Sequence, residues 1–220
     1  MLSNPQELER TTSEKQSAGI LFVVSSPSGG GKGTLIRRLL DVTPDLGYSV
    51  SYTTRAPRNG EVNGREYFFV NCDAFEKMIA TDDFLEWACV HGNYYGTSRH
   101  QVAEETLAGV DIVLEVDVQG AESIRTLQLD SVSIFILPPS YEVLRRRLIT
   151  RGTDTEAQLE LRLRNAPEEL KQYSLFDYVV VNDDLERAAR QIASIVYAER
   201  ARCRRQAHVV QKIIEKFEFS

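Results

Sequence analysis

The sequence of 220 residues contains few of the residues that build disulfide frameworks or zinc sites. Its three cysteines, Cys72, Cys89 and Cys203, lie far apart and form no CxxC pair. This pattern excludes a disulfide framework and is typical of a reducing compartment, so we expect a cytoplasmic protein. The three histidines have no metal-ligand spacing, which argues against a zinc site and favours polar surface positions. They are His91, His100 and His208.

Long apolar runs are also missing. No stretch approaches the ~20 consecutive apolar residues that a membrane-spanning helix needs, so we expect no membrane association. The N-terminal segment MLSNPQELERTTSEKQSAG is polar, mixed in charge and without the apolar core of a signal peptide. We therefore expect a flexible tail over residues 1–18 and one folded domain over residues 19–220.

Positive charge is scarce, and lysine especially so. The 26 Lys and Arg residues against 32 Asp and Glu give a net charge of −6, which argues against non-specific binding of nucleic acid. Of the 26 cations only 6 are lysine and 20 are arginine. Because arginine grips carboxylate or phosphate with a bidentate fork, the excess indicates oxyanion ligands. Codon bias explains it equally well at the level of composition.

Strand-like and helix-like segments alternate along most of the chain. Short apolar, β-branched runs predict strands at 20–26, 112–116, 132–137 and 178–181. Helical patterns follow residue 32 and occupy 99–108, 119–127, 140–150, 156–172 and a long segment from 185 onward. This alternation predicts an α/β fold with a mostly parallel sheet covered on both faces. Residues 48–98 break the rhythm with short aromatic segments and Asn-Gly turns, which predicts a small, mainly β insertion.

The segment SSPSGGGKGT lies between the first strand and the first helix. Its glycines let backbone N–H groups converge on an oxyanion, the helix N-terminus adds positive potential, and Lys32 can reach the β and γ phosphates. An ordinary Gly-rich turn with a solvated lysine is the alternative, and the flanking strand and helix favour phosphate binding. The predicted phosphate-binding residues are Ser26, Pro27, Ser28, Gly29, Gly30, Gly31, Lys32, Gly33 and Thr34.

This phosphate loop departs from the pattern G-x-x-x-x-G-K-[ST] at two positions. Ser26 replaces the first glycine, and Gly33 replaces the hydroxyl residue that follows the lysine. The GKGT ending is similar to adenylate-kinase-like loops, which also lack that hydroxyl. Either Thr34 or only phosphates and water would then hold Mg²⁺.

A second group of motifs follows the loop. In TTRAPRNGE two arginines lie three residues apart beside a turn, and together with hydroxyls and the tyrosine of GREYFF they can surround a second phosphate. With FLEWA, GNYYGT, VDVQG, RGT and VNDD in the same order, the chain resembles the guanylate kinases from about residue 19 to residue 199. The resemblance implies transfer of the γ-phosphoryl group of ATP to GMP, giving ADP and GDP, with Mg²⁺.

The resemblance also implies an architecture. It implies a P-loop NTPase-type three-layer α/β fold with a core formed by residues 19–50, 99–140 and 166–220. A small β-rich GMP-binding sub-domain would occupy 51–98, and a helical lid would occupy 141–165.

The same resemblance assigns residues to GMP. Glu86 in FLEWA is the guanine reader, because a carboxylate can accept from the N1–H and 2-amino groups together, a pair that adenine does not present. Without the motif, Glu86 would be interpreted as an exposed carboxylate on an edge strand. The predicted phosphate ligands are Arg55, Arg58, Tyr67 and Tyr95, and Ser51 and Thr97 would contact O6 or neighbouring base atoms.

Asp117 follows the strand at 112–116, where Walker-B-type carboxylates lie in P-loop folds. It would either organise Mg²⁺ through water or hold the base and ribose of GMP. Glu115, two residues earlier on the same strand face, shares this ambiguity. The metal candidates are therefore Thr34 and Asp117.

Six arginines lie between residues 141 and 164. By the resemblance, Arg147, Arg151 and Arg162 are lid ligands of ATP and, together with Lys32 and Arg58, act as electrostatic catalysts. Asn182 in VNDD would contact ATP on its adenine side. The others, Arg145, Arg146 and Arg164, fall outside the match and are expected on a solvated face. No general base is expected, because the second pKa of a phosphate monoester is about 6.

Two other functions compete with this one. A guanylate-kinase-like module that binds phosphorylated peptides would resemble the enzyme near the GMP phosphate, but such modules usually have a damaged ATP loop. A kinase for another nucleoside monophosphate is the second alternative, which Glu86 and Thr97 argue against.

Residues 200–220 extend beyond the resemblance. Their four arginines are followed by apolar residues at helical spacing, Val209, Val210, Ile213, Ile214 and Phe217. This spacing predicts a helix that docks on its own core, the commoner outcome, or on another subunit as a homo-oligomer. RNA binding by the arginines is a weaker alternative.

Overall fold

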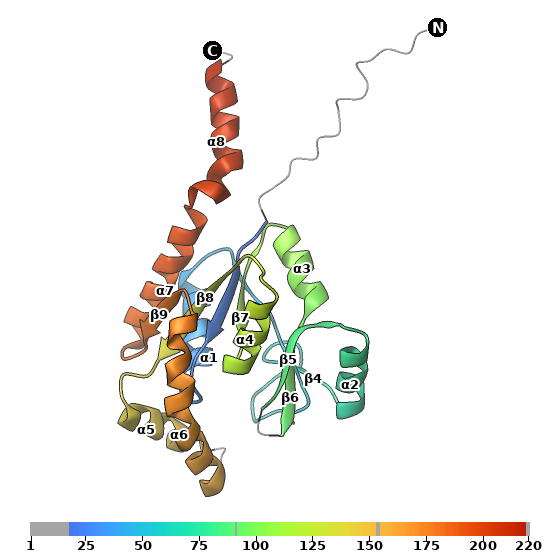
Figure 1. Cartoon of the computed structure of the whole chain (residues 1–220), viewed down its shortest axis with the longest axis vertical. Coiled ribbons are helices and arrows are strands. Elements are labelled where there is room, and N and C mark those ends of the chain that lie inside the picture. Colours follow the sequence, from blue (N-terminus) through green and yellow to red (C-terminus); the bar gives the residue numbers. More distant parts are fainter. Residues whose placement is uncertain (1–17, 91, 153–154, 219–220) are drawn as a thin grey trace.

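A five-stranded parallel sheet forms the centre of the protein in the computed structural model, which describes residues 18–90, 92–152 and 155–218. Its order is β2 (Leu46–Tyr48), β7 (Asp111–Glu115), β1 (Leu21–Ser25), β8 (Ser131–Leu137) and β9 (Tyr178–Val181) (Figure 1). Strand β1 is buried throughout because it is paired on both sides, with Val23 opposite Leu114 of β7 and Ser133 of β8. The sheet confirms the prediction of parallel strands. The short edge strand β2 gave no clear sequence signal.

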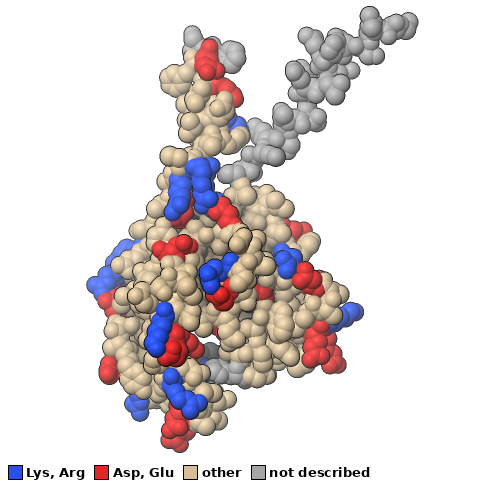
Figure 2. All heavy atoms as spheres, in the orientation of Figure 1, with Lys and Arg blue, Asp and Glu red and all other residues tan. Residues whose placement is uncertain are grey.

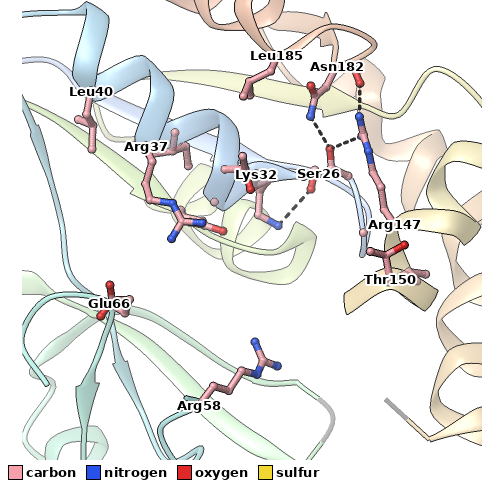
Figure 3. A pocket seen from close by; sticks show the side chains of 18 of the residues that line it. Ser26, Lys32, Arg37, Leu40, Arg58, Glu66, Arg147, Thr150, Asn182 and Leu185 are labelled. Atoms are coloured by element: carbon pink, nitrogen blue, oxygen red, sulfur yellow. Dashed lines mark hydrogen bonds between the residues drawn. The ribbon is translucent and has the colours of Figure 1, made fainter. Parts of the chain in front are cut away.

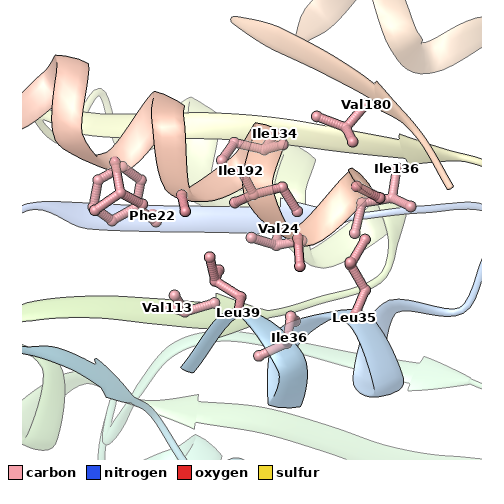
Figure 4. Close-up of a cluster of buried hydrophobic side chains, with 14 of the residues drawn as sticks. Phe22, Val24, Leu35, Ile36, Leu39, Val113, Ile134, Ile136, Val180 and Ile192 are labelled. Carbon is pink, nitrogen blue, oxygen red and sulfur yellow. The ribbon is translucent and has the colours of Figure 1, made fainter. Parts of the chain in front are cut away.

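Helices cover both faces of this sheet, as predicted. On one face, α1 (Lys32–Val42) and α7 (Leu185–Arg200) pack on alternate residues of the strands, including Phe22 and Val24 (Figure 4). On the other, α3 (Arg99–Leu107) and α4 (Val118–Thr126) cover Leu21 and Val23. Each fully buried aliphatic side chain contributes about 1.5–3 kcal/mol, so these two clusters fix the layers that carry the phosphate loop.

The insertion forms a second sheet with the order β4 (Phe68–Phe69), β3 (Tyr52–Thr53), β6 (Asn93–Ser98) and β5 (Phe84–Val90). It also contains a helix, α2 (Cys72–Ala80), which the sequence pattern did not predict. The side chain of Asn71 caps this helix, and Phe75 stacks on Phe84 at 4.4 Å and on Tyr94 at 5.2 Å. The aromatic residues that indicated a β insertion are therefore the core between its helix and its sheet.

Two helices follow β8 at the carboxyl edge of the main sheet. Helix α5 (Tyr141–Arg151) begins after the cap residue Ser140 and ends at Gly152, and α6 (Glu156–Lys171) begins with a capping box formed by Thr155 and Gln158. Leu144 and Leu148 of α5 pack on Ala166 of α6 in a separate apolar cluster. A short 3₁₀ helix, η2 (Gln172–Leu175), then leads toward β9.

The C-terminal helix α8 (Cys203–Glu218) projects away from the body, so the expectation that it docks on its own core is wrong (Figure 1). None of its described residues is buried, and Phe217 is 80% exposed. The break between α7 and α8 falls at Ala201 and Arg202, and Arg204 and Arg205 then pair with Asp130. Figure 2 shows basic side chains gathered where α8 leaves the body.

Two remaining predictions concern the ends of the chain and membranes. The expected tail at residues 1–18 lies, apart from residue 18, outside the described residues. Within the described part of the chain, no helix is both long and apolar enough to cross a bilayer.

Candidate active site

The carboxyl ends of the central strands open into one cavity of about 1270 Å³ (Figure 3). Its walls are the phosphate loop, residues of α5 around Arg147, and residues of the insertion around Arg58 and Tyr67. Small-molecule sites usually measure about 300–1,000 Å³. The cavity is therefore large enough for two ligands that meet between the phosphate loop and the insertion.

The phosphate loop turns sharply between β1 and α1. Gly29 and Gly31 have φ angles of +85° and +87°, a region that side chains other than glycine rarely adopt. A Cβ atom on Gly31 would lie 2.7 Å from the Nδ2 atom of Asn182, and one on Gly29 would lie 2.8 Å from Leu148. Gly31 precedes α1 without a side-chain cap, so the first N–H groups of this helix are available for an anion.

Ser26, which replaces the first glycine of the motif, has a defined role. Its Oγ atom accepts a hydrogen bond from the Nζ atom of Lys32 at 3.2 Å and donates one to the carbonyl oxygen of Pro27 at 2.8 Å. Lys32 is thereby held at the wall of the cavity (Figure 3). A Cβ atom on Gly30 would lie 2.7 Å from Ser26, so the serine and the glycine depend on each other.

Arg147 and Asn182 both donate hydrogen bonds to the phosphate loop. The Nη1 atom of Arg147 donates to the carbonyl oxygen of Gly30 at 3.2 Å, and its Nη2 atom donates to the carbonyl oxygen of Asn182 at 2.7 Å. The Nδ2 atom of Asn182 donates to the same Gly30 oxygen at 3.0 Å (Figure 3). Burial, and secondarily the charge of Arg146, lowers the pKa of Arg147.

The other arginines of α5 and α6 differ in placement. Arg162 is buried, and its Nη1 atom donates to the Oγ atom of Ser28 at 3.2 Å. Arg145 and Arg164 are exposed as expected. Arg146 is exposed as expected and also lines the cavity. The side chain of Arg151 lies outside the described part of the structure.

Across the cavity, Arg55 lies among aromatic rings and a carboxylate. It makes two hydrogen bonds of 2.9 Å to Glu61, and its guanidinium lies 5.4 Å from the centre of the Tyr67 ring. The ring of Tyr67 lies 5.8 Å from that of Tyr95, and the backbone N–H of Arg58 donates to Glu61 at 2.7 Å. The structure therefore brings together all four residues predicted to bind the GMP phosphate.

Glu61 is a residue that the sequence reasoning missed, although it lies within the quoted motif. Burial opposes its ionisation, but the hydrogen bonds from Arg55 and from the backbone of Arg58 outweigh this effect and lower its pKa. The paired geometry of Arg55 and Glu61 is the one that a bound phosphate would offer to the same fork.

Glu86 lies on the edge strand β5 but is only 8% exposed, so its interpretation as an exposed carboxylate is wrong. Burial raises the pKa of Glu86 to about 7, the hydrogen bond from Thr97 opposes this shift, and the charge of Asp117 adds to it. The Oγ1 atom of Thr97 donates to Glu86 at 2.6 Å. Ser51 is also buried in the insertion.

Gly120, the glycine of VDVQG, leaves space for the side chain of Glu86 beside helix α4. A Cβ atom on Gly120 would lie 2.7 Å from the Oε2 atom of Glu86. Asp117 caps the same helix, because its Oδ1 atom accepts from the N–H of Gly120 at 2.9 Å. Asp117 therefore lies on the Glu86 side of the site.

Glu115, by contrast, faces the phosphate loop. Its Oε2 atom would lie 3.4 Å from a Cβ atom on Gly33, and it accepts a hydrogen bond from the hydroxyl of Tyr48 at 3.4 Å. Its charge also contributes, after burial, to the raised pKa of Tyr48 and of Tyr67. Glu115 and Thr34 line the cavity. Among the described residues no group of three His, Cys, Asp or Glu side chains could hold a metal ion by itself.

These features define a class of protein. The cavity has a Gly-rich loop at a helix N-terminus, arginines from two neighbouring helices, and an Arg-Tyr cluster on the opposite wall. This combination is typical of a P-loop phosphotransferase with two anionic substrates.

Comparison with known proteins identifies the family. The family model described as guanylate kinase matches residues 19–199. A guanylate kinase of Nitrosomonas europaea is 51% identical over 197 residues, which cover 90% of this chain and 98% of that protein. A guanylate kinase of Geobacter sulfurreducens is 46% identical over 195 residues, which cover 89% and 96%. The crystal structure of guanylate kinase from Anaplasma phagocytophilum matches with a TM-score of 0.71 and 37% identity, covering 85% of this chain and 89% of that one.

The chain belongs to the guanylate kinase family. It is an ATP-dependent kinase that phosphorylates GMP to GDP. The family match confirms the resemblance over the range in which the motifs indicated it. The alternatives of an inactive binding module and of a kinase for another monophosphate are therefore set aside.

Replacing Gly31 by Ala tests the packing of the phosphate loop. We expect the affinity for ATP, measured by isothermal titration calorimetry, to fall at least tenfold, because the added Cβ atom would collide with Asn182. Gly92→Ala is the matched control, since Gly92 also has a positive φ of 79° but nothing within 4 Å of the added atom. Equal losses of ATP affinity in both variants would contradict the packing argument.

Proposed function

We propose that the cavity binds ATP and GMP at the same time, with ATP on the phosphate loop and GMP against the insertion. The observation that supports this is the continuous wall from Lys32 to Arg58 and Tyr67. In this proposal residues 51–98 are the GMP-binding sub-domain, residues 141–165 are the lid, and the other parts of residues 19–220 are the core.

The triphosphate of ATP would contact the N–H groups at the start of α1, and Lys32, Arg147, Arg151 and Arg162 would neutralise its charge. In the present arrangement Arg147 donates to the carbonyl oxygens of Gly30 and Asn182, and Arg162 donates to the hydroxyl of Ser28. Both can exchange these for phosphate, to which charge-assisted hydrogen bonds are stronger. Asn182 would support the loop on the same side.

GMP would present its phosphate to Arg55, Arg58, Tyr67 and Tyr95. The phosphate would replace Glu61 at the fork of Arg55. The guanine would reach Glu86 through its N1–H and 2-amino groups, with Ser51, Thr97 and Asp117 around the base. Burial of Glu86 supports this role, because a carboxylate withdrawn from water gains from partners that only guanine supplies.

The reaction then needs alignment and charge stabilisation more than proton transfer. The acceptor oxygen of GMP is largely ionised at neutral pH, and Lys32, Arg58 and the lid arginines would stabilise the charge that develops on the transferred phosphoryl group. Mg²⁺, when bound with ATP, would orient and partly neutralise the phosphates. Thr34 and the carboxylate of Glu115 fit this ion as direct or water-mediated ligands, because both line the cavity at the loop. Asp117, the other candidate, caps α4.

We also place the reaction in the cytoplasm. Cys72, Cys89 and Cys203 are free and exposed, which is typical of a reducing compartment.

The function is tested by a coupled assay of ATP with GMP, AMP, UMP or dTMP. We expect GDP formation with GMP and little product with the others.

Lys32→Ala should lower turnover at least 100-fold while changing GMP affinity less than twofold, because Lys32 lies on the ATP side. Arg145→Ala removes one exposed cation and serves as the control. Unchanged turnover in Lys32→Ala would remove Lys32 from the mechanism.

The raised pKa of Glu86 predicts how GMP binding depends on pH. Because the carboxyl group is protonated below about pH 7, it cannot accept both guanine donors there. We expect the KM for GMP to rise roughly tenfold between pH 8 and pH 6, since about one tenth of the groups would be ionised one unit below the pKa.

Glu86→Gln is the control for this prediction. The phosphate of GMP also titrates near pH 6, and any pH dependence of KM that persists in Glu86→Gln belongs to the phosphate.

The raised pKa of Glu86 also predicts that folding stability falls as the pH rises, whereas binding of GMP improves. A carboxyl group with a raised pKa stabilises the fold when protonated, and this contribution is lost as the pH rises through 7. Glu86→Gln should therefore have a higher Tm than the wild type at pH 8, and an unchanged or lower Tm would contradict the assignment.

We further propose that α8 pairs with α8 of a second copy. Its apolar face consists of Val209, Val210, Ile213, Ile214 and Phe217, which are 42–80% exposed. The spacing of three and four residues among Val210, Ile213 and Phe217 is that of a helix-pair seam. Because α8 projects from the body (Figure 1), its exposed apolar face is open to a second α8, and a two-fold pairing would close the assembly.

Ile213→Glu tests this pairing. We expect light scattering after size-exclusion chromatography to give twice 24.9 kDa for the wild type and 24.9 kDa for the variant. Gln211→Glu adds the same charge outside the apolar face and should leave the dimer intact. A wild-type mass of 24.9 kDa at micromolar concentration would refute the proposal.

A further inference from the structure

Helix α6 contacts the phosphate loop through a carboxylate that no motif singled out. The Oε2 atom of Glu169 accepts a hydrogen bond from the backbone N–H of Ser28 at 2.8 Å. We propose that Glu169 is a positioning residue, which sets the conformation of the phosphate loop for ATP. The proposal rests on the assignment of the phosphate loop to ATP.

The spacing along α6 supports this role. Arg162, Ala166 and Glu169 are separated by four and three residues, so they lie on one face of the helix. Arg162 donates to the side-chain oxygen of Ser28, and Glu169 accepts from its backbone N–H. Ala166 between them is 1% exposed and packs on Leu144 and Leu148. One face of α6 therefore holds Ser28 at two atoms, through the positive Arg162 and the negative Glu169.

The contact also affects which loop atoms face the ligand. Ser28 does not belong to the cavity wall, whereas Ser26 and the residues from Gly29 to Thr34 do. The N–H of Ser28 is bound to Glu169 on the side of α6, and the N–H of Gly30 closes a turn by donating to the carbonyl oxygen of Pro27 at 2.9 Å. Glu169 therefore fixes the start of the turn that leads to the residues lining the cavity. A carboxylate beside an anion site opposes phosphate binding through its charge. Its benefit must therefore come from the geometry that it imposes.

Pro167 separates the two contacts along α6. A proline inside a helix removes one backbone hydrogen bond and allows a bend there. Arg162 lies before Pro167, in the segment proposed as the lid, and Glu169 lies after it. Arg162 can therefore leave Ser28 for a phosphate of ATP while Glu169 keeps the loop in place.

Three variants test this inference. Glu169→Ala removes the acceptor, Glu169→Gln keeps an acceptor oxygen without the charge, and Glu168→Ala is the control. Glu168 is the neighbouring carboxylate, which is 74% exposed and pairs with Lys171. The first measurement is hydrogen exchange of the backbone N–H groups of the phosphate loop without nucleotide, followed by mass spectrometry. The second is KM for ATP and for GMP.

We expect loop exchange to rise at least tenfold in Glu169→Ala and KM for ATP to rise roughly tenfold, the effect of losing one hydrogen bond to a charged group. KM for GMP should change less than twofold. Glu169→Gln should keep KM for ATP within about threefold of the wild type, and Glu168→Ala should match the wild type in every measurement.

Two results separate this inference from the function on which it rests. Unchanged loop exchange in Glu169→Ala would overturn the positioning role, whatever happens to the kinetics. Faster exchange in Glu169→Ala with an unchanged KM for ATP would show that Glu169 holds the loop without setting its conformation for ATP, and would overturn the proposal. Loop exchange in the wild type that ATP does not slow would instead contradict ATP binding by that loop. An equal rise of both KM values would indicate a general loss of structure and would also overturn the proposal. The Tm of each variant checks that it is folded.

Discussion

The hydrogen bonds to the carbonyl oxygen of Gly30 are the contacts on which the rest of the site depends. Arg147 of α5 and Asn182 at the end of β9 both donate to this one oxygen. A carbonyl fixed in this way also fixes the direction of the N–H group of Gly31 in the same peptide, which an anion site can use. The loop is thus anchored at the same time to the sheet, through Asn182, and to the helices proposed as the lid, through Arg147.

A net-acidic protein can bind two polyanions because its cations are organised locally. Arg55 is paired with Glu61, and Arg147 and Arg162 are bound to oxygen atoms of the loop and of β9. These contacts hold long side chains in place, so less conformational freedom is lost when a phosphate replaces the present partner. The excess of arginine over lysine has a structural explanation at Arg55 and Arg147, because each donates through two N–H groups and Arg55 also lies over the ring of Tyr67. Elsewhere codon bias stays an equal explanation.

Glu86, unlike these arginines, lies in surroundings that disfavour its charged form. Its burial in the insertion is unfavourable for the charged form and raises its pKa to about 7, so above this pH the ionised side chain stabilises the fold less than a neutral one would. Thr97 satisfies one oxygen, and Gly120 leaves room for the other. A guanine that supplies two donors would relieve this penalty, and adenine would not. Selectivity for the base would then come from a destabilised carboxylate.

Apolar periodicity and contiguous motifs are local properties of the chain, and they were enough to predict most core strands and helices, the phosphate loop and the family, but not β2 or α2. Tertiary contacts distinguish Glu115 from Asp117, two residues apart, because Glu115 faces Gly33 and Asp117 caps α4. Only the tertiary structure decided the burial of Glu86, the partners Glu61 and Glu169, and the projection of α8 away from the core. These properties depend on contacts between residues up to 141 positions apart, and no local pattern in the sequence encodes which distant backbone atom a side chain will meet.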